Sequence, residues 1–360
     1  MLAKDFNFDK FSYFLEEKQA FLRKFLTGEH RGPVLTQRVC GDTFGVASQT
    51  REKSLADQLD CMDIKMQLHS DVAFTYLEPW CGVGVYANAF GAPLFWYEHC
   101  DVQTKSRYHD VEEVLSVPMP KAGDCELMQM VLDYIRYFRA ETHDLIPISL
   151  TDTQSPLDTA SLILDPCELF AASLEAPEDL EDFMTKITQV IGDFSEMQIE
   201  AIGDALYAAP GHMMFSHTGA GGIALSDDNM AVVSPASYAA IGKPYNEMLS
   251  RRFGGVSLHS CGLIKHNVPL LLQTEGLQQL DFKITDFEPN DAAYLAEQFA
   301  GTGILLKPCV QPEEDLTRIL PLLRSDVKLV VHVFTHGTVD QCNRQYDHVA
   351  QFVHDHYQFV

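Results

Sequence analysis

The sequence predicts an α/β protein built as a single (β/α)8 barrel. Eight short β-rich runs recur along the chain, and amphipathic helical patterns separate them. Most of these runs are continuously apolar, which is typical of parallel strands covered by helices. No run leads into a Gly-x-Gly-x-x-Gly turn, and this disfavours a doubly wound open sheet, the alternative fold for the same alternation.

The predicted strands begin after an N-terminal helical extension over residues 1–32, and we expect all 360 residues to form one domain. The strands are 33–38, 72–77, 145–150, 213–218, 255–259, 280–284, 303–308 and 328–334.

Helical periodicity fills the intervals between these strands. Apolar residues recur at spacings of three and four over 127–138 and 180–191, and Gly192 marks the expected end of the second helix. Further helices are predicted over 234–253, with Pro244 as an expected kink, over 312–324 and over 338–357.

Composition and charge exclude several classes of function. Hydrophobic residues make up 46% and charged residues 21%, the balance of a globular chain rather than a disordered one. The net charge of −25 argues against nucleic acid, because binding to it relies on Lys and Arg neutralising phosphates. It also argues against anionic membrane surfaces.

The nine cysteines are scattered, odd in number and without a Cys-x-x-Cys pair. The N-terminal segment has no apolar core of the signal-peptide type, and no window approaches ~18 apolar residues without charge. We therefore expect a cytoplasmic protein whose cysteines are free thiols.

Polar side chains gather where the predicted strands end, which in a (β/α)8 barrel is the face that carries the chemistry. Asp227 and Asp228 have the alternative of capping a helix or shaping a loop. Glu78 is a candidate acid or base because a buried carboxylate is costly without a partner. The candidate catalytic residues are Glu78, Asp152, His217, Asp227 and Asp228.

The stretch "GGVSLHSCGLI" (254–264) places His259 and Cys261 two residues apart at the end of a predicted strand. They are either metal ligands or a core cysteine beside a hydrogen-bonded histidine. Zinc takes three or four N/S ligands and leaves one position open in a catalytic site. Cys309 and His336, expected on nearby strand ends, are the candidates that complete the set, and the sequence does not choose between them. His332 alternates with Phe334 in the last strand and is expected in the core.

Four segments together resemble the uroporphyrinogen decarboxylase superfamily, in particular its zinc-dependent corrinoid methyltransferase branch, which includes methylcobalamin:coenzyme M methyltransferases. The resemblance runs along nearly the whole chain. The segments are "LEPWCGVGVYANAFGAPLFW", "TDTQSPLDTASLIL", "GIALSDDNMAVVSPASYAAIGKPYNEML" and "GGVSLHSCGLI".

The resemblance implies a (β/α)8 zinc enzyme in which His259 and Cys261 supply two ligands. The branch takes a third from a late Cys-Gly pair, where this sequence reads "FTHGTV" and has His336 instead. The implied reaction moves a methyl group between a corrinoid and a small methylated substrate or a thiol. The chain has no Asp-x-His-x-x-Gly stretch, so the corrinoid (methylcobalamin) is expected to arrive on a carrier protein.

Two alternatives remain. A cofactor-free decarboxylase would hold its substrate's carboxylates with arginines near the N-terminus; Arg38 is present, but Asp42 stands where the second arginine is expected. A non-catalytic protein that binds zinc and a small molecule is the other alternative.

Overall fold

The structure is a computed structural model, and it describes residues 1–39, 50–98, 100–207, 214–216, 221–285, 287 and 289–360. Its centre is a six-stranded parallel sheet in the order β1-β8-β7-β6-β5-β4. These strands are β1 (Val34–Val39), β4 (Ile223–Ser226), β5 (Val256–Ser260), β6 (Leu277–Lys283), β7 (Leu305–Val310) and β8 (Lys328–Thr335). A separate antiparallel hairpin pairs β2 (Leu94–Phe95) with β3 (Gln103–Thr104).

Two further segments, one containing Asp71 and Leu77 and the other containing Ile148 and Gln154, lie between β1 and β4 and close the sheet into a barrel. The backbone N–H of Asp71 donates to the Leu35 carbonyl of β1 at 3.1 Å. Leu77 bridges Ile148 in parallel, and Gln154 bridges Ser226 of β4 in parallel. The (β/α)8 fold predicted from the sequence is therefore confirmed. The two additional segments are joined to their neighbours by isolated β-bridges rather than by continuous ladders.

The prediction of a strand over 213–218 is wrong for residues 214–216, and residues 213, 217 and 218 lie outside the described residues; the fourth strand is β4. Residues 214–216 form no strand, and the side-chain amide of Gln279 bonds both the N–H and the C=O of Phe215. The Phe215 ring stacks on Phe74, with 4.4 Å between the ring centroids. An apolar run of this kind fills a barrel interior as well as it forms a strand, which is why periodicity alone misplaced it.

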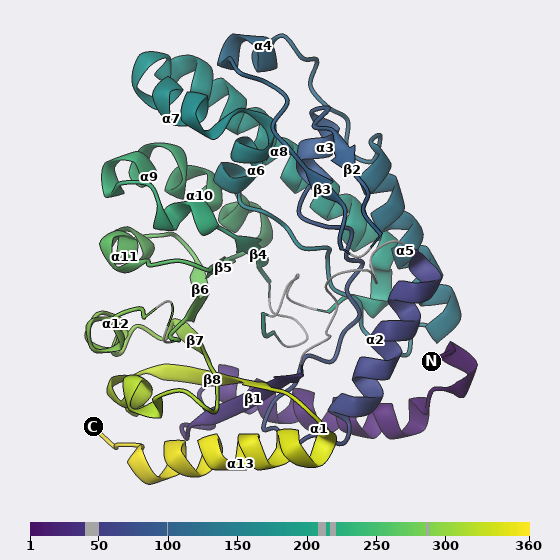
Figure 1. Ribbon diagram of the computed structural model, residues 1–360, viewed down its shortest axis with the longest axis vertical. Coiled ribbons are helices and arrows are strands. Elements are labelled where there is room, and N and C mark those ends of the chain that lie inside the picture. Colours follow the sequence, from purple (N-terminus) through teal and green to yellow (C-terminus); the bar gives the residue numbers. More distant parts are fainter. Residues whose placement is uncertain (40–49, 99, 208–213, 217–220, 286, 288) are drawn as a thin grey trace.

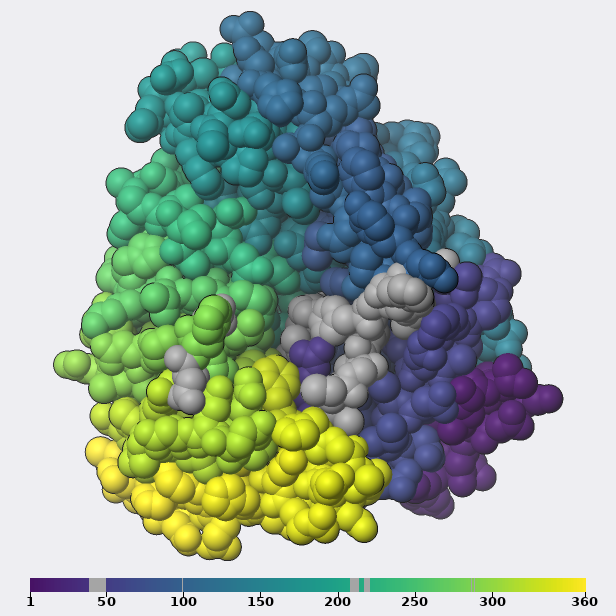
Figure 2. Space-filling view, viewed as in Figure 1, coloured from purple at the N-terminus to yellow at the C-terminus, as the bar shows by residue number. Residues whose placement is uncertain are grey.

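The helices lie outside the strands. In Figure 1, α9 to α12 follow one another along the outer side of the arc from β4 to β7, and α13 lies beside β8 and β1. In Figure 2, the colours run round the visible face in sequence order, as expected when successive strand–helix units form a ring.

The α-helices are α1 (Phe8–Leu26), α2 (Arg51–Lys65), α3 (Val85–Ala89), α4 (Val111–Leu115), α5 (Glu126–Thr142), α6 (Pro156–Ile163), α7 (Pro166–Glu175), α8 (Pro177–Ile202), α9 (Pro235–Ile241), α10 (Lys243–Phe253), α11 (Val268–Leu271), α12 (Ala292–Phe299) and α13 (Val339–His356). Short 3-10 helices are η1 (Ala3–Asp5), η3 (Gly203–Ala205), η4 (Asp228–Ala231), η5 (Lys265–Asn267) and η6 (Leu316–Leu322). No helix among the described residues is long and apolar enough to cross a membrane.

Three helix predictions differ from the structure. Helix α8 continues through Gly192 to Ile202. Gly192 does not end the helix; it leaves room for the Arg252 guanidinium, which bonds Asp193 and Glu196 on the same helix. The expected kink at Pro244 is a break between α9 and α10, with Pro244 in the first turn of the second helix. The segment 312–324 forms only η6, which contains Pro321.

Candidate metal centre and active site

Strand β5 ends at the first candidate ligands. All five residues of the strand are buried, and His259 is 9% exposed. The imidazole Nε2 of His259 lies 3.2 Å from the Sγ of Cys261. Two soft donor atoms therefore face each other beyond the carboxyl end of the strand, where barrel enzymes carry their sites.

A carboxylate from the neighbouring strand joins this pair. Asp228 follows β4, and its Oδ1 accepts the backbone N–H of Cys261 at 2.5 Å. Ligand atoms of Asp228, His259 and Cys261 all lie within 4.8 Å of one another, so the three form a group that could hold a metal ion. The structure thus brings Asp228, predicted as a catalytic residue, together with the two predicted ligands.

The loop that carries the exposed Asp228 is held in place by a buried acid, Asp158. Asp158 in the first turn of α6 accepts the backbone N–H groups of Asp228 and Asn229, at 2.6 and 2.8 Å. Burial and the nearby Asp227 charge raise the pKa of Asp158 well above its usual range. Asp158 thereby fixes the start of η4 and the position of Asp228.

Asp227 is a buried anchor rather than an open catalytic group. Its carboxylate accepts hydrogen bonds from Ser155, Tyr238 and Asn246 at 2.7 to 3.0 Å. Burial raises the pKa of Asp227 despite these donors. Through these hydrogen bonds Asp227 connects the start of α6 with α9 and α10. The network therefore holds the segment that follows β4 against the segment that precedes α6.

On the other side of His259, Nδ1 lies 2.5 Å from Oδ2 of Asp281 on β6. Burial alone lowers the pKa of the His259 imidazole, but the Asp281 charge and its hydrogen bond outweigh burial and raise that pKa to about 10. A carboxylate on the ring nitrogen opposite to the ligating one is the usual support of a metal-bound histidine, since it orients the ring. The geometry of His259 therefore fits metal binding through Nε2.

Asp281 has a second cationic partner. Its Oδ1 lies 2.6 Å from Nζ of Lys307 on β7, and both side chains are essentially inaccessible to solvent. Burial acts to raise the pKa of Asp281, but Lys307 and His259 hold it far below its usual range. The Asp281 carboxylate therefore contacts two basic side chains inside the barrel, His259 through Oδ2 and Lys307 through Oδ1.

The predicted third ligands lie in two different places. Cys309 on β7 is buried, with its Sγ 3.6 Å from Oδ1 of Asp281 and 3.7 Å from Nδ1 of His332. Burial raises the pKa of the Cys309 thiol well above its usual range. Asp281, Cys309 and His332 form a second group of potential ligand atoms within 4.8 Å of one another. Cys309 is thus grouped with Asp281 rather than with Cys261.

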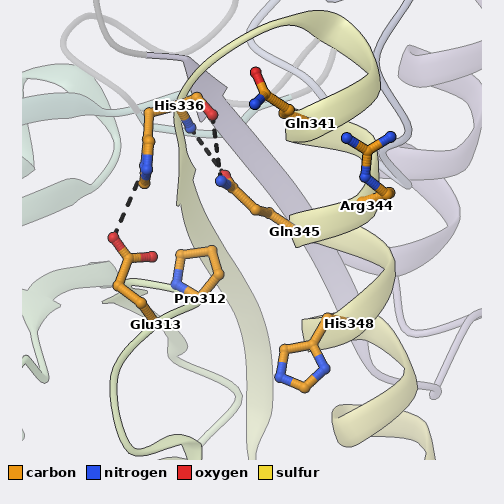
Figure 3. A pocket seen from close by; sticks show the side chains of 7 residues that line it. All are labelled: Pro312, Glu313, His336, Gln341, Arg344, Gln345 and His348. Carbon is orange, nitrogen blue, oxygen red and sulfur yellow. Dashed lines mark hydrogen bonds and ion pairs between the residues drawn. The ribbon is translucent and has the colours of Figure 1, made fainter.

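His336 follows β8 and lines a shallow surface pocket of about 590 Å³ with Arg344 and His348 of α13 (Figure 3). Its Nδ1 lies 3.8 Å from Oε1 of Glu313, and its backbone N–H and C=O bond the Gln345 amide. Neither group of potential ligands among the described residues includes His336.

Glu78 and Asp152 lie on the two segments that close the barrel between β1 and β4, and both side chains are buried. Gln58 of α2 bonds the backbone N–H and C=O of Glu78, which fixes that strand end. Asp152 accepts from Ser226 at 3.0 Å and from Gln154 at 2.6 Å. The remaining catalytic candidate, His217, lies outside the described residues.

Sequence reasoning missed Asp158, Asp281 and Lys307. The last two carried a signal, because each is a charged residue within a predicted strand: Asp281 in "LDFKI" and Lys307 in "GILLKP". A charge at such a position is buried only if it is paired. Asp158 carried no comparable signal, because an acid in the first turn of a helix is common on surfaces.

Comparison with protein families gives one match. The family model described as uroporphyrinogen decarboxylase (URO-D) matches residues 23–210, just over half of the chain. The chain belongs to the uroporphyrinogen decarboxylase family. The match to this family ends before β4, so His259 and Cys261 lie outside the matched part.

A structural comparison covers more of the chain. A methyltransferase from Methanosarcina mazei matches with a TM-score of 0.64 and 16% sequence identity, over 93% of this chain and 99% of that one. At this identity the likeness shows a shared fold only, and it extends across β4 to β8. No curated protein sequence gives a significant match to the chain.

Proposed function

We propose that this protein is a zinc-dependent methyltransferase that moves a methyl group between a corrinoid and a small methylated substrate or a thiol. The observation that carries the proposal is the group of Asp228, His259 and Cys261 at the carboxyl ends of β4 and β5. Membership of the family and the structural likeness to a methyltransferase are consistent with it.

The donor set fits zinc. An imidazole nitrogen, a thiolate sulfur and a carboxylate oxygen are all ligands that Zn²⁺ accepts, and three protein ligands leave a position for substrate. His259, Cys261 and Asp228 would hold the ion, with Asp281 orienting His259 through Nδ1. The bound ion supplies Lewis-acid chemistry, which lowers the pKa of a thiol or polarises the oxygen or nitrogen that carries the methyl group.

We assign the remaining roles, proton transfer and positioning of the Asp228 loop, to the buried carboxylates. Asp152 and Glu78 lie on neighbouring strand ends and are the candidates for moving a proton to or from the substrate's heteroatom. Asp227 and Asp158 shape the loop that carries Asp228 and hold it in place. The corrinoid is proposed to arrive on a carrier protein, in the cytoplasm, with no part for nucleic acid or membranes.

Metal analysis tests the first half of this proposal. Purified protein is expected to contain one zinc per chain, and His259→Ala or Cys261→Ala is expected to lose it. His348→Ala and Cys167→Ser, at exposed helical positions, are matched controls that keep the metal. Zinc-free wild-type protein that does not take up zinc would refute the metal site.

Activity assays test the second half. Methylcobalamin with a panel of thiols, followed by the change in corrinoid absorbance, examines transfer to a thiol. Methylated amines and aryl methyl ethers with a reduced corrinoid carrier examine the opposite direction. Turnover that disappears in Cys261→Ala but persists in Cys167→Ser supports methyl transfer at this site. Zinc binding without turnover in either direction points instead to a non-catalytic zinc protein.

The family match itself favours a second candidate, decarboxylation of a porphyrinogen. Arg38 at the end of β1 is available for a substrate carboxylate, and its guanidinium lies over the Phe334 ring, 5.4 Å from the centroid. A cofactor-free decarboxylase would not need the group of potential metal ligands formed by Asp228, His259 and Cys261, and we therefore place this candidate second. Release of CO₂ from uroporphyrinogen, abolished by Arg38→Gln and unaffected by Cys261→Ala, would reverse the order.

A further inference from the structure

A second group of potential ligands lies inside the barrel, and a lysine occupies it. Asp281, Cys309 and His332 come from the adjacent strands β6, β7 and β8, and all three side chains are buried. Lys307 stands opposite Asp281 in the β6–β7 register, and Cys309 stands opposite His332 in the β7–β8 register. The sheet register therefore brings four chemically active side chains to one place.

The spacing of the donor atoms is that of a metal site. Zn–S and Zn–N bonds at a tetrahedral angle place two ligand atoms about 3.5 Å apart. The Sγ of Cys309 lies 3.6 Å from Oδ1 of Asp281 and 3.7 Å from Nδ1 of His332. The thiol is thus already at the distance from the carboxylate and from the imidazole that a small divalent cation requires, and all three ligand atoms lie within 4.8 Å of one another.

The cation present among them is the ammonium of Lys307. Its Nζ lies 2.6 Å from Oδ1 of Asp281 and 3.3 Å from Nδ1 of His332. It also lies over the Phe74 ring, 5.7 Å from the centroid. An ammonium only donates hydrogen bonds, so Nδ1 of His332 accepts and the ring is the neutral Nε2–H tautomer. A lone pair that would bind a metal is therefore directed at Lys307.

We propose that Lys307 is the fixed cation of a latent metal site formed by Asp281, Cys309 and His332. While the ammonium is present, electrostatic repulsion and occupied donor atoms keep a divalent cation out. Removal of the lysine side chain leaves an anionic, pre-arranged ligand set that binds one metal ion. The proposal concerns a different set of ligands from that of the proposed function. Asp281 connects the two sites, because its Oδ2 orients His259 and its Oδ1 belongs to the latent site.

The role of Lys307 follows from this arrangement. Among the described residues, zinc has two candidate groups. The lysine restricts the ion to the group at the barrel mouth, which is Asp228, His259 and Cys261. The lysine also engages Oδ1 of Asp281, which leaves Oδ2 to orient His259. Metal selectivity between the two groups is therefore set by a covalently attached cation rather than by ligand type.

Titration of the metal-free full-length chain with Co²⁺ tests the proposal, because thiolate ligands to cobalt give a strong near-ultraviolet absorption. Lys307→Ala is expected to bind one Co²⁺ more than the wild type, with added thiolate absorption. Lys307→Ala/Cys309→Ser is expected to return to the wild-type stoichiometry. Lys328→Ala, on the adjacent strand β8, is the matched control and gains no metal.

Three outcomes would overturn the proposal: no gain of metal in Lys307→Ala, a gain that persists without Cys309, or a wild-type chain that already binds metal through Cys309. If Lys307→Ala is unfolded when metal-free, Co²⁺-dependent refolding is the expected result, because a ligand of the folded state stabilises it. Failure of both Lys307→Ala and Lys307→His to refold with Co²⁺ would also overturn it.

The same titration separates this proposal from the proposed function. Loss of the wild-type equivalent in Cys261→Ser reports only on the group at the barrel mouth. A wild-type chain that binds no metal contradicts the proposed function, and a Cys309-dependent equivalent in Lys307→Ala still supports the latent site.

Discussion

Nδ1 of His259 and Oδ2 of Asp281 lie 2.5 Å apart across neighbouring strands, while Nε2 of the same ring faces Cys261. This contact joins the candidate metal centre to the barrel interior, because the other oxygen of Asp281 contacts Lys307. The properties of the site therefore depend on residues that a ligand at the barrel mouth does not touch.

Asp281→Asn is predicted to destabilise the protein by about 3–5 kcal/mol, because it leaves the buried Lys307 ammonium without its counter-charge. Asp281→Asn/Lys307→Met removes both charges and is predicted to recover most of that loss. Denaturant unfolding of the two variants measures the difference. Equal stability of the single and double variants would show that the ion pair is not what holds these strands.

Metal affinity is predicted to rise with pH up to about pH 10. The pKa of His259 in the metal-free protein is raised to about 10, so binding at neutral pH displaces its proton. Each displaced proton changes the affinity about tenfold per pH unit. Competition with a chelator across this range measures the slope, and a flat profile would contradict a protonated His259.

The same shift affects the stability of the metal-free protein. A histidine whose folded pKa is raised stabilises the fold fully below its ordinary pKa of about 6.5, and this contribution is lost as the pH rises through about 10. Unfolding experiments on metal-free wild type and His259→Gln measure it. The variant is predicted to lack this alkaline loss.

The third ligand is predicted to be Asp228. Asp228→Ala is expected to lower zinc affinity by at least about tenfold, because it removes a donor atom from the group and a hydrogen bond from the Cys261 backbone. His336→Ala is expected to leave the affinity unchanged. The reverse result in a zinc competition assay would restore the ligand set in which His336 takes the third position.

Asp158→Ala is predicted to cost about 1–3 kcal/mol, because two backbone N–H groups of η4 lose their acceptor. Asp158→Asn retains an acceptor oxygen and is predicted to cost less. Zinc affinity is predicted to fall more in Asp158→Ala than in Asp158→Asn, since Asp158 positions the loop that carries Asp228. A zinc affinity equal to the wild type in Asp158→Ala would show that the loop holds its place unaided.

The sequence predicts the barrel because apolar runs alternate with helices eight times. One misplaced strand does not change this pattern, so the fold prediction holds although the fourth strand is wrong. The sequence misplaces the fourth strand because Phe215 is as apolar as a strand residue while it packs inside the barrel against Phe74. Gly192 predicts a helix end when the sequence alone is considered, but its lack of a side chain makes room for Arg252, which is distant in the sequence.

The candidate site was predictable where its residues are close in sequence. His259 and Cys261 share one strand end, so spacing alone placed them together. The relation of Asp228 to Cys261, and of Asp281 to His259, depends on which strands are neighbours and on their register. The sequence predicts Cys309 and His336 at one place because both follow predicted late strands. The structure separates them: Cys309 lies within β7 and is buried, whereas His336 follows β8 and lies at the surface.

The residues of the candidate site are spread along the chain, and this has a consequence for how the protein would acquire the proposed zinc ion. Asp158, Asp228, Cys261 and Asp281 belong to four successive units of the barrel, and hydrogen bonds between units align them. A nascent chain lacks this arrangement until those units have docked, unlike a zinc finger, whose ligands are local and whose folding requires the ion. The barrel is therefore expected to mature first and to load zinc afterwards, so that a cell short of zinc would accumulate a folded, activatable reserve of the protein.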